Sequence, residues 1–182
     1  YYVRFEHESS MPYPTGFNWA NTWFNYSKMV QEAKSRNIEV VFAITCWDPS
    51  GSIPVDDVDN PGSHAYFIVH TVVDFILTYC PEISGIMLDY VRYDVGAYTE
   101  QEKDLIVKFV KRVRGKIGRK GFGAPRSYID VWCSMGEDGR DSVGQRYSDF
   151  AGFADDLVVM MYGGSGPPYP SSDIAKYSKR AL

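Results

Sequence analysis

The sequence predicts an α/β fold, a partial (β/α)8 barrel that forms one domain over residues 1–182. Apolar runs typical of buried strands alternate with amphipathic helical patterns, which implies parallel strands joined by right-handed crossovers. Polar residues follow nearly every predicted strand, as they do at the mouth of a barrel. A doubly wound sheet fits the same alternation, but no Gly-x-Gly-x-x-Gly or phosphate-binding loop follows any strand, which counts against a nucleotide-binding fold.

The first half of the chain contains two strand–helix repeats. Asn37 is a residue type that can end the first helix, and Pro81 ends the second helical pattern. The second strand is apolar and β-branched, as expected of a strand that is buried on both faces. The predicted elements in order are a strand at residues 1–5, a helix at 21–36, a strand at 38–45 and a helix at 63–79.

The second half of the chain repeats the pattern. Thr99-Glu-Gln-Glu102 is a capping-box sequence, so a helix should begin there, and Gly118 and Gly121 should end it. Ser142-Val-Gly-Gln145 is a second possible capping box before a short helix. The predicted elements in order are a strand at residues 83–90, a helix from 99 to 118, a strand at 128–135, a helix at 142–154 and a strand at 157–162.

The length of the chain limits how much of a barrel it contains. A complete barrel of this kind needs about 250 residues, whereas this chain has 182 residues and about five predicted strands. We therefore expect a central or partial portion of a barrel.

Composition and charge exclude several classes of function. The formal net charge of −4 argues against a nucleic-acid-binding protein, which would present a basic stripe. No apolar stretch approaches the roughly 20 residues that span a bilayer, so no membrane span is expected. Cys46, Cys80 and Cys133 show no metal-ligand spacing, and neither does any set of His and carboxylate residues. No metal or other cofactor is therefore expected.

The segment from Ile83 to Asp94 points to a functional site. Its apolar strand pattern breaks abruptly into Asp89, Arg92 and Asp94. A carboxylate at the end of a buried strand is costly to desolvate unless it has a partner or a task. Side chains alternate along a strand, so Asp89 points into the barrel mouth if Leu88 packs against the helices. The same alternation predicts that Val91 shares the face of Asp89.

Gly85-Ile-Met-Leu-Asp-Tyr-Val-Arg-Tyr93 resembles the signature of a family of TIM-barrel glycosyl hydrolase domains, in which an Asp-Tyr-Val-Arg-Phe-type motif closes the fourth strand. The last strand, with its Met-x-Tyr sequence, also resembles that of family 18 chitinases, although their Asp-x-x-Asp-x-Asp-x-Glu signature is absent. Further segments that resemble the glycosyl hydrolase domains are Asn37 to Asp48, Val131 to Met135, Val143-Gly-Gln145 and Asp156 to Tyr162.

The chain departs from this family pattern at two positions. Asp94 replaces a proline that follows the strand-four motif, and Val159 stands where a proline precedes the final Met-x-Tyr. The resemblance covers residues 36 to 165 and implies a TIM barrel and the reaction class of a glycoside hydrolase, without identifying the substrate.

Glycosidic cleavage commonly uses two carboxyl groups, one as acid and one as nucleophile or base. Asp89 is the first candidate for a catalytic carboxylate, with a structural pairing to Arg92 as the alternative. The predicted catalytic partner of Asp89 is either Glu137 or Asp48, and Glu6 ranks next. All three residues follow predicted strands, so the sequence does not choose between them.

A second group of residues is predicted to bind substrate. Arg92 either holds Asp89 ionised, binds an anionic sugar group, or forms a salt bridge outside the barrel. Trp47 is expected to stack on a sugar, and Tyr162 either hydrogen-bonds a sugar or closes the core. The predicted substrate-binding residues are Arg92, Tyr162, Asp94, Glu6 and Trp47.

These residues favour a glycoside hydrolase that acts on an extracellular or cell-wall polysaccharide. The expected partner is a carbohydrate, and the expected location is extracellular or at the cell surface. A catalytically silent carbohydrate-binding barrel is the first alternative, favoured if no second carboxyl group lies near Asp89. The second alternative is another barrel hydrolase, such as a deacetylase or a cell-wall amide hydrolase. A metal near Asp48 and His7 would favour this alternative.

Overall fold

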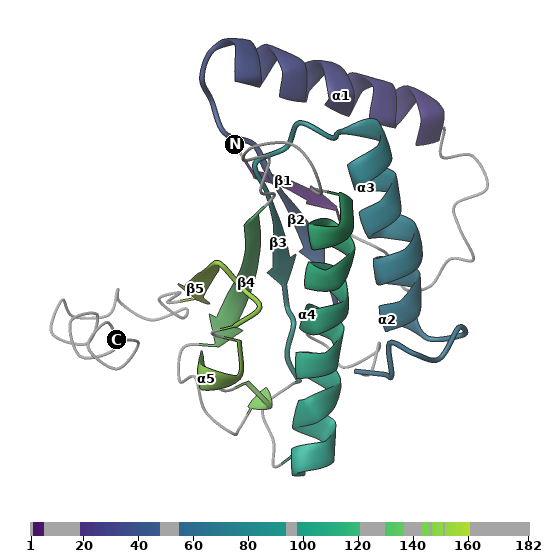
Figure 1. Cartoon of the computed structure of the whole chain (residues 1–182), viewed down its shortest axis with the longest axis vertical. Coiled ribbons are helices and arrows are strands. Elements are labelled where there is room, and N and C mark those ends of the chain that lie inside the picture. The colour runs from purple at the N-terminus through teal and green to yellow at the C-terminus, as the bar shows by residue number, and fades with distance from the viewer. Residues whose placement is uncertain are drawn as a thin grey trace, which may run out of the picture.

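The computed structural model describes residues 2–5, 19–47, 55–93, 98–120, 130–136, 143–145, 147–150 and 152–160. Strands and helices alternate along these residues (Figure 1). The strands are β1 (Tyr2–Phe5), β2 (Val41–Thr45), β3 (Gly85–Asp89), β4 (Asp130–Gly136) and β5 (Asp156–Met160). The helices are α1 (Trp19–Ser35), α2 (His64–Phe67), α3 (Val73–Tyr79), α4 (Glu100–Lys120) and α5 (Tyr147–Phe150), with a π-helical segment, η1 (Ile68–Val72), between α2 and α3.

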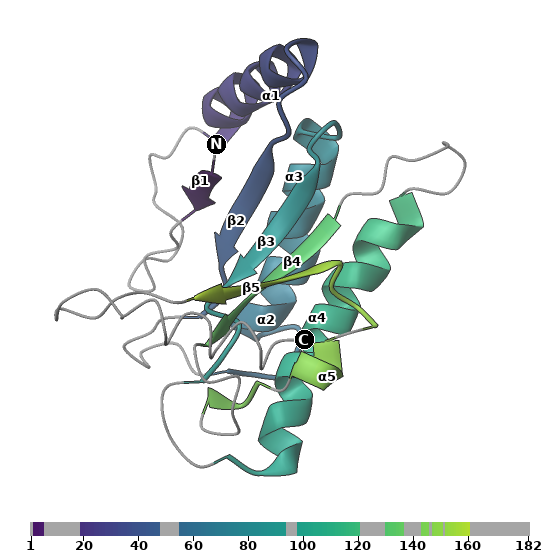
Figure 2. The ribbon, with the colours of Figure 1, turned by 90° about the vertical axis from the view of Figure 1, so that its left-hand side faces the viewer.

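The sheet has the strand order of a barrel. The five strands lie in the order β1-β2-β3-β4-β5, and every neighbouring pair is parallel. A doubly wound sheet would reverse its strand order at a switch point and carry helices on both faces. Here α3 lies behind β2 and β3 in Figure 2, and α4 packs on the same side of the sheet, in one apolar cluster with α3 and β3. The predicted partial barrel is therefore confirmed.

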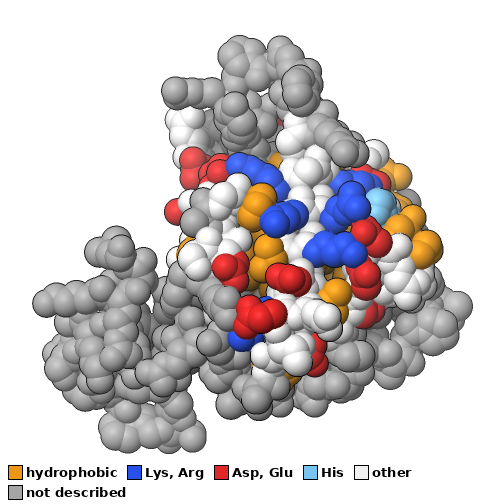
Figure 3. All heavy atoms as spheres, turned by 60° about the horizontal axis from the view of Figure 1, so that its bottom comes forward, with side chains coloured by type: hydrophobic (Ala, Val, Ile, Leu, Met, Phe, Trp, Pro, Cys, Tyr) orange, Lys and Arg blue, Asp and Glu red, His pale blue; other side chains and the backbone are white. Residues whose placement is uncertain are grey.

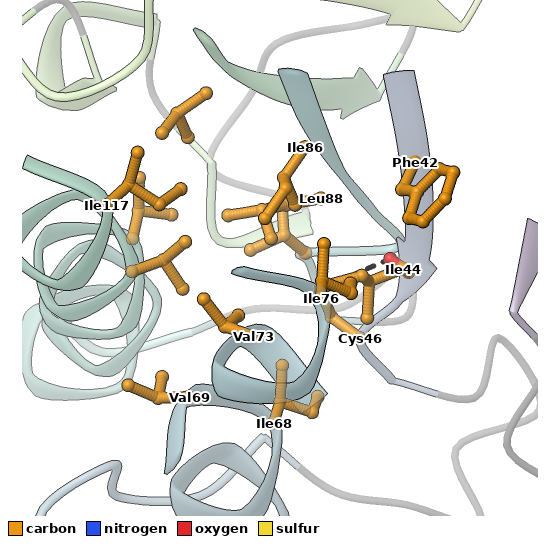
Figure 4. Close-up of a cluster of buried hydrophobic side chains, with 14 of the residues drawn as sticks. Phe42, Ile44, Cys46, Ile68, Val69, Val73, Ile76, Ile86, Leu88 and Ile117 are labelled. Atoms are coloured by element: carbon orange, nitrogen blue, oxygen red, sulfur yellow. Dashed lines mark hydrogen bonds between the residues drawn. The ribbon is translucent and has the colours of Figure 1, made fainter. Parts of the chain in front are cut away.

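The two faces of the sheet carry different apolar clusters, as the period of two requires. Ile86 and Leu88 of β3 pack in the large cluster that faces Ile76 of α3 (Figure 4). The opposite face carries a smaller cluster, which contains Val41, Ala43 and Met87 with Val158 packed against it. The first face is the helix-covered outside of the barrel wall, and the second is its inner face.

Two helix ends follow the expectations from the sequence. Asn37 has a φ of 56° and ends α1 in a Schellman motif, in which Ile38 N–H donates to the Ala33 carbonyl and Asn37 N–H to the Lys34 carbonyl. At the start of α4, Glu102 accepts the Thr99 amide at 2.7 Å, and the Glu102 amide donates back to the Thr99 hydroxyl at 3.3 Å. The predicted capping box is confirmed.

The outer surface of α4 is bound to its neighbours by ion pairs. Lys108 contacts Asp57 at 2.6 Å and Asp59 at 2.9 Å, and Arg112 contacts Asp59 at 2.8 Å. Figure 3 shows Lys and Arg side chains beside Asp and Glu side chains on this face. The basic residues late in α4 therefore form part of a mixed, solvated surface. Within the described residues, no helix is long and apolar enough to cross a membrane.

Candidate functional site

Asp89 is the last residue of β3 and lies at the carboxyl end of the parallel sheet. It is half-buried and stands opposite Thr45, the last residue of β2, in the strand register. Leu88 packs on the helix side, whereas Met87 belongs to the inner cluster. Asp89 is two residues after Met87, so strand alternation places it on the inner face, at the edge where barrel sites lie.

The chain turns sharply after Asp89. Tyr90 has a φ of 51°, and its amide donates to Asp89 Oδ1 at 2.9 Å. A left-handed conformation is unfavourable for a bulky residue and is often found at functional sites. This turn reverses the alternation of the strand, so Val91 is fully buried on the helix side. The prediction that Val91 shares the face of Asp89 is therefore wrong.

The loop that follows β4 holds the turn that follows β3. Gln145 is fully buried, and its Nε2 donates to the Val91 carbonyl at 3.0 Å. The Tyr93 amide donates to the Val143 carbonyl, also at 3.0 Å. Gly144 has a φ of 72°, and a Cβ there would lie 2.5 Å from the Tyr93 ring. We call residues 91–93 and 143–145 together the loop clamp.

Gln145 was expected to cap a helix, yet its amide reaches Val91, 54 positions earlier in the chain. Gly144 is left-handed, and α5 begins only at Tyr147, so the helix predicted over residues 142–154 is reduced to one turn. The Gly-Gln pair was visible in the sequence, but nothing in it indicated a partner in the loop after β3.

Tyr93 connects the loop clamp to the first turn of α4. Its hydroxyl donates to the Glu102 carbonyl at 2.9 Å, and its ring stacks on Tyr98 at 4.2 Å between centroids. Burial, followed by the nearby Glu102 and Tyr98, raises the pKa of Tyr93 to about 12. The phenol therefore stays protonated at ordinary pH and acts as a structural hydrogen-bond donor.

Arg92 packs against the ring of Tyr90, the residue that follows Asp89. Its guanidinium carbon lies 5.4 Å from the centre of the Tyr90 ring, in a cation–π arrangement. Among the residues that the structure describes, no ion pair joins Arg92 to Asp89. Binding of an anionic sugar group by Arg92 stays a prediction.

Trp47 lies in the core. Its side chain is 2% exposed, and its ring packs against Phe109 of α4 with 4.9 Å between centroids. Stacking on a sugar requires an exposed ring face, so this placement does not fit the predicted sugar-binding role and corrects it. Among the described residues, the buried indole Nε1 of Trp47 has no hydrogen-bond partner.

The remaining predicted site residues lie outside the described residues. These are Asp48, Glu137, Asp94, Glu6 and Tyr162, together with His7. The cysteines are poor candidates for chemistry, because burial raises the pKa of Cys80 to about 11 and that of Cys133 to about 12. Across the described part of the chain, no group of three His, Cys, Asp or Glu residues is placed to hold a metal ion.

No family model and no curated protein matches the sequence of the chain. Solved structures match its fold. A family 18 chitinase from Cycas revoluta has a TM-score of 0.62 at 14% identity, over 90% of this chain and 52% of that one. A chitinase-like agglutinin from Robinia pseudoacacia has a TM-score of 0.60 at 14% identity, with 90% and 53% covered. A spore cortex-lytic enzyme from Bacillus megaterium has a TM-score of 0.55 at 12% identity, with 85% and 36% covered.

At these identities, the likeness establishes the fold. The predicted distant similarity to family 18 chitinase-like barrels is confirmed at this level. The chain spans about half the length of the first two proteins and about a third of the cortex-lytic enzyme. It therefore provides part of a barrel.

Proposed function

We propose that this protein is a glycoside hydrolase and that Asp89 is one of its catalytic carboxyl groups. The observation that supports this most is the place of Asp89 at the carboxyl end of β3, on the face of the sheet away from the helices. Enzymes built on this barrel carry their active sites at that edge. The left-handed Tyr90 that follows adds local strain of the kind found at active sites.

The chemistry requires a second carboxyl group. One group protonates the oxygen of the leaving sugar, and the other attacks the anomeric carbon or activates a water molecule. Glu137 and Asp48 are our candidates for this partner, followed by Glu6. A separation of about 5–5.5 Å from Asp89 would predict retention of anomeric configuration, and about 6.5–9.5 Å would predict inversion.

Polymers that contain N-acetylglucosamine are the substrates to test first. The Cycas revoluta chitinase was solved with (GlcNAc)4, and a spore cortex-lytic enzyme has the same fold. Arg92 lies over the ring of Tyr90, the residue after Asp89, and its positive charge suits a carboxylate on the substrate. We therefore infer action on an extracellular or cell-wall polysaccharide, at the cell surface or outside the cell.

Hydrolysis of chitin, peptidoglycan and neutral polysaccharides by wild type and Asp89→Asn tests the proposal, with release of reducing ends as the measurement. We expect turnover to fall by about 10²–10⁴-fold in the variant, the usual contribution of a general acid or base. Asp104→Asn is the matched control, because Asp104 is exposed on α4. Unchanged turnover in Asp89→Asn would exclude Asp89 from catalysis.

A carbohydrate-binding protein without activity is the second candidate. This candidate is favoured by the similarity to the chitinase-like agglutinin, whose TM-score of 0.60 is close to the 0.62 of the chitinase. Titration of chitooligosaccharides by calorimetry distinguishes the two candidates. Saturable binding without product release from any polymer would support binding alone, whereas product release would exclude it.

A further inference from the structure

The loop clamp supports an inference about how the site is built, which rests on the proposed catalytic role of Asp89. We propose that Gln145 is a positioning residue, which fixes the Asp89 carboxylate by holding the turn after β3 in its left-handed conformation. Gln145 is fully buried and contacts the turn through the Val91 carbonyl, so it acts on Asp89 through the backbone.

The orientation of the Asp89 carboxylate depends on Tyr90. Asp89 Oδ1 accepts the Tyr90 amide at 2.9 Å, and this amide lies in the peptide plane that joins Asp89, which is paired in the sheet, to Tyr90, whose left-handed φ of 51° leads the chain to Val91. A tyrosine does not favour that conformation, so surrounding contacts must maintain it. If Val91 were no longer held, the peptide plane between Asp89 and Tyr90 would be free to rotate, and the carboxylate would lose this hydrogen bond.

Val91 is held on both sides. Its side chain is fully buried in the helix-side cluster, and its carbonyl accepts the Gln145 amide. A buried carbonyl that loses its donor is costly, so the two contacts together determine where the turn can lie. The Tyr93 amide and the Val143 carbonyl provide a second bond between the same two loops.

Gly144 lets the two loops approach this closely. A Cβ at this position would lie 2.5 Å from one atom of the Tyr93 ring and 3.2 Å from Ile106 of α4. The φ of 72° at Gly144 also disfavours residues with a side chain. The conformation of the loop after β4 therefore brings Gln145 into contact with the turn that follows Asp89.

Gln145→Glu makes the donor to the Val91 carbonyl depend on pH and so tests this hydrogen bond directly. A carboxyl group donates to the Val91 carbonyl only when it is protonated, and burial raises the pKa of such a group. An ionised carboxylate would instead face the carbonyl oxygen and repel it. We therefore expect the variant to recover as the pH falls. Gln145→Leu has no donor at any pH and should not recover.

The experiment measures kcat and KM of wild type, Gln145→Glu and Gln145→Leu from pH 4 to pH 8, on a polysaccharide that wild type hydrolyses. At pH 8 we expect kcat to fall about 10–100-fold in both variants with KM changed by less than about 2-fold, because misplaced groups lose orientation rather than binding. At pH 4, Gln145→Glu should return to within about 3-fold of wild type. A thermal melt at each pH verifies that every variant is folded.

Dividing the kcat of each variant by the kcat of wild type at the same pH removes the effect of ionisations that all the proteins share. The titratable and charged groups described around the clamp are Asp89, Arg92, Tyr93 and Glu102, and all variants share them. Gln31→Glu is the matched control, because Gln31 is exposed on α1 and its variant should follow wild type at every pH.

If Gln145→Leu does not fold, the recovery of kcat in Gln145→Glu at low pH tests the proposal by itself. A kcat equal to wild type in the folded variants, or a loss in Gln145→Glu that does not change with pH, overturns the proposal.

A second readout separates this inference from the proposed function. If wild type hydrolyses no polymer, the proposed function fails, and amide hydrogen exchange still tests the clamp. Gln145→Leu should speed exchange at the Tyr90 amide by about 10-fold or more, while the Phe42 amide in β2 keeps its protection. Unchanged protection of the Tyr90 amide would show that Gln145 does not hold the turn.

Discussion

The backbone amide of Cys46 donates to the carbonyl oxygen of Asp89 at 2.7 Å. This bond continues the pairing of β2 and β3 past Thr45 and Asp89, the last pair in register. Asp89 is therefore held through its carbonyl by one strand and through its carboxylate by the Tyr90 amide. A side chain fixed by the sheet itself is better suited to exact chemistry than one carried on a free loop.

Substitutions at Asp89 should separate its structural role from its catalytic one. Asn retains an oxygen that can accept the Tyr90 amide, so Asp89→Asn should change the free energy of unfolding by less than about 0.5 kcal/mol. Asp89→Ala removes the acceptor and should lower the free energy of unfolding by about 0.5–1.5 kcal/mol. Urea unfolding of both variants provides the measurement. Equal destabilisation by Asn and Ala would show that the charge matters more than the acceptor.

Tyr90 should show the cost of its left-handed backbone. Tyr90→Ala and Tyr90→Gly both remove the ring and its contact with Arg92, so they differ mainly in how well they accept a φ of 51°. Gly adopts this conformation without a steric penalty, and we expect its variant to be more stable than Ala by about 1 kcal/mol. Chemical unfolding of the pair measures the difference, and a more stable Ala variant would contradict the assignment of strain.

Arg92 should influence the choice of substrate rather than stability. If it binds a carboxylate on the substrate, Arg92→Gln should lower kcat/KM on an acidic polysaccharide by about 10-fold and on a neutral one by less than about 2-fold. Arg92→Lys should retain part of the preference, since lysine keeps the charge but loses the planar fork. Equal losses on both substrates would assign Arg92 to the packing of Tyr90.

Glu102 should contribute a pH-dependent part of the stability. Hydrogen bonds from the Thr99 amide and hydroxyl lower the pKa of Glu102 below its usual value of 4.5. A carboxyl group with a lowered pKa in the folded state stabilises the fold above its unfolded pKa, and this contribution is lost as the pH falls through the folded pKa. Glu102→Gln should therefore melt below wild type at pH 7, and the two should converge as the pH falls through the lowered pKa of Glu102 in the folded state. A difference between the two melting temperatures that does not shrink as the pH is lowered would contradict the capping role of the charge.

Local patterns were sufficient to predict most of the elements. The helical period identifies α1 and α4, Asn37 ends α1, and the Thr99–Glu102 capping box begins α4. Each of these signals involves residues within about one helical turn of each other, so the sequence displays it directly. The break from apolar residues into Asp89 is also local, and it located the end of β3.

Three features depend on contacts between distant parts of the chain and could not be predicted in this way. Trp47 is buried because α4, more than 50 positions later, brings Phe109 against its ring. The left-handed Tyr90 moves Val91 to the helix side, although neither residue type indicates such a turn. Gln145 finds its acceptor 54 positions earlier.

The sequence by itself therefore determined the order of strands and helices and placed a carboxylate at a strand end, because hydrophobic periodicity and helix capping act over a few neighbouring residues. Only the tertiary structure decided the face on which Val91 lies, the burial of Trp47 and the contact that holds the turn after Asp89. These depend on side chains that meet when the parallel strands align and bring their following loops together at one edge of the sheet.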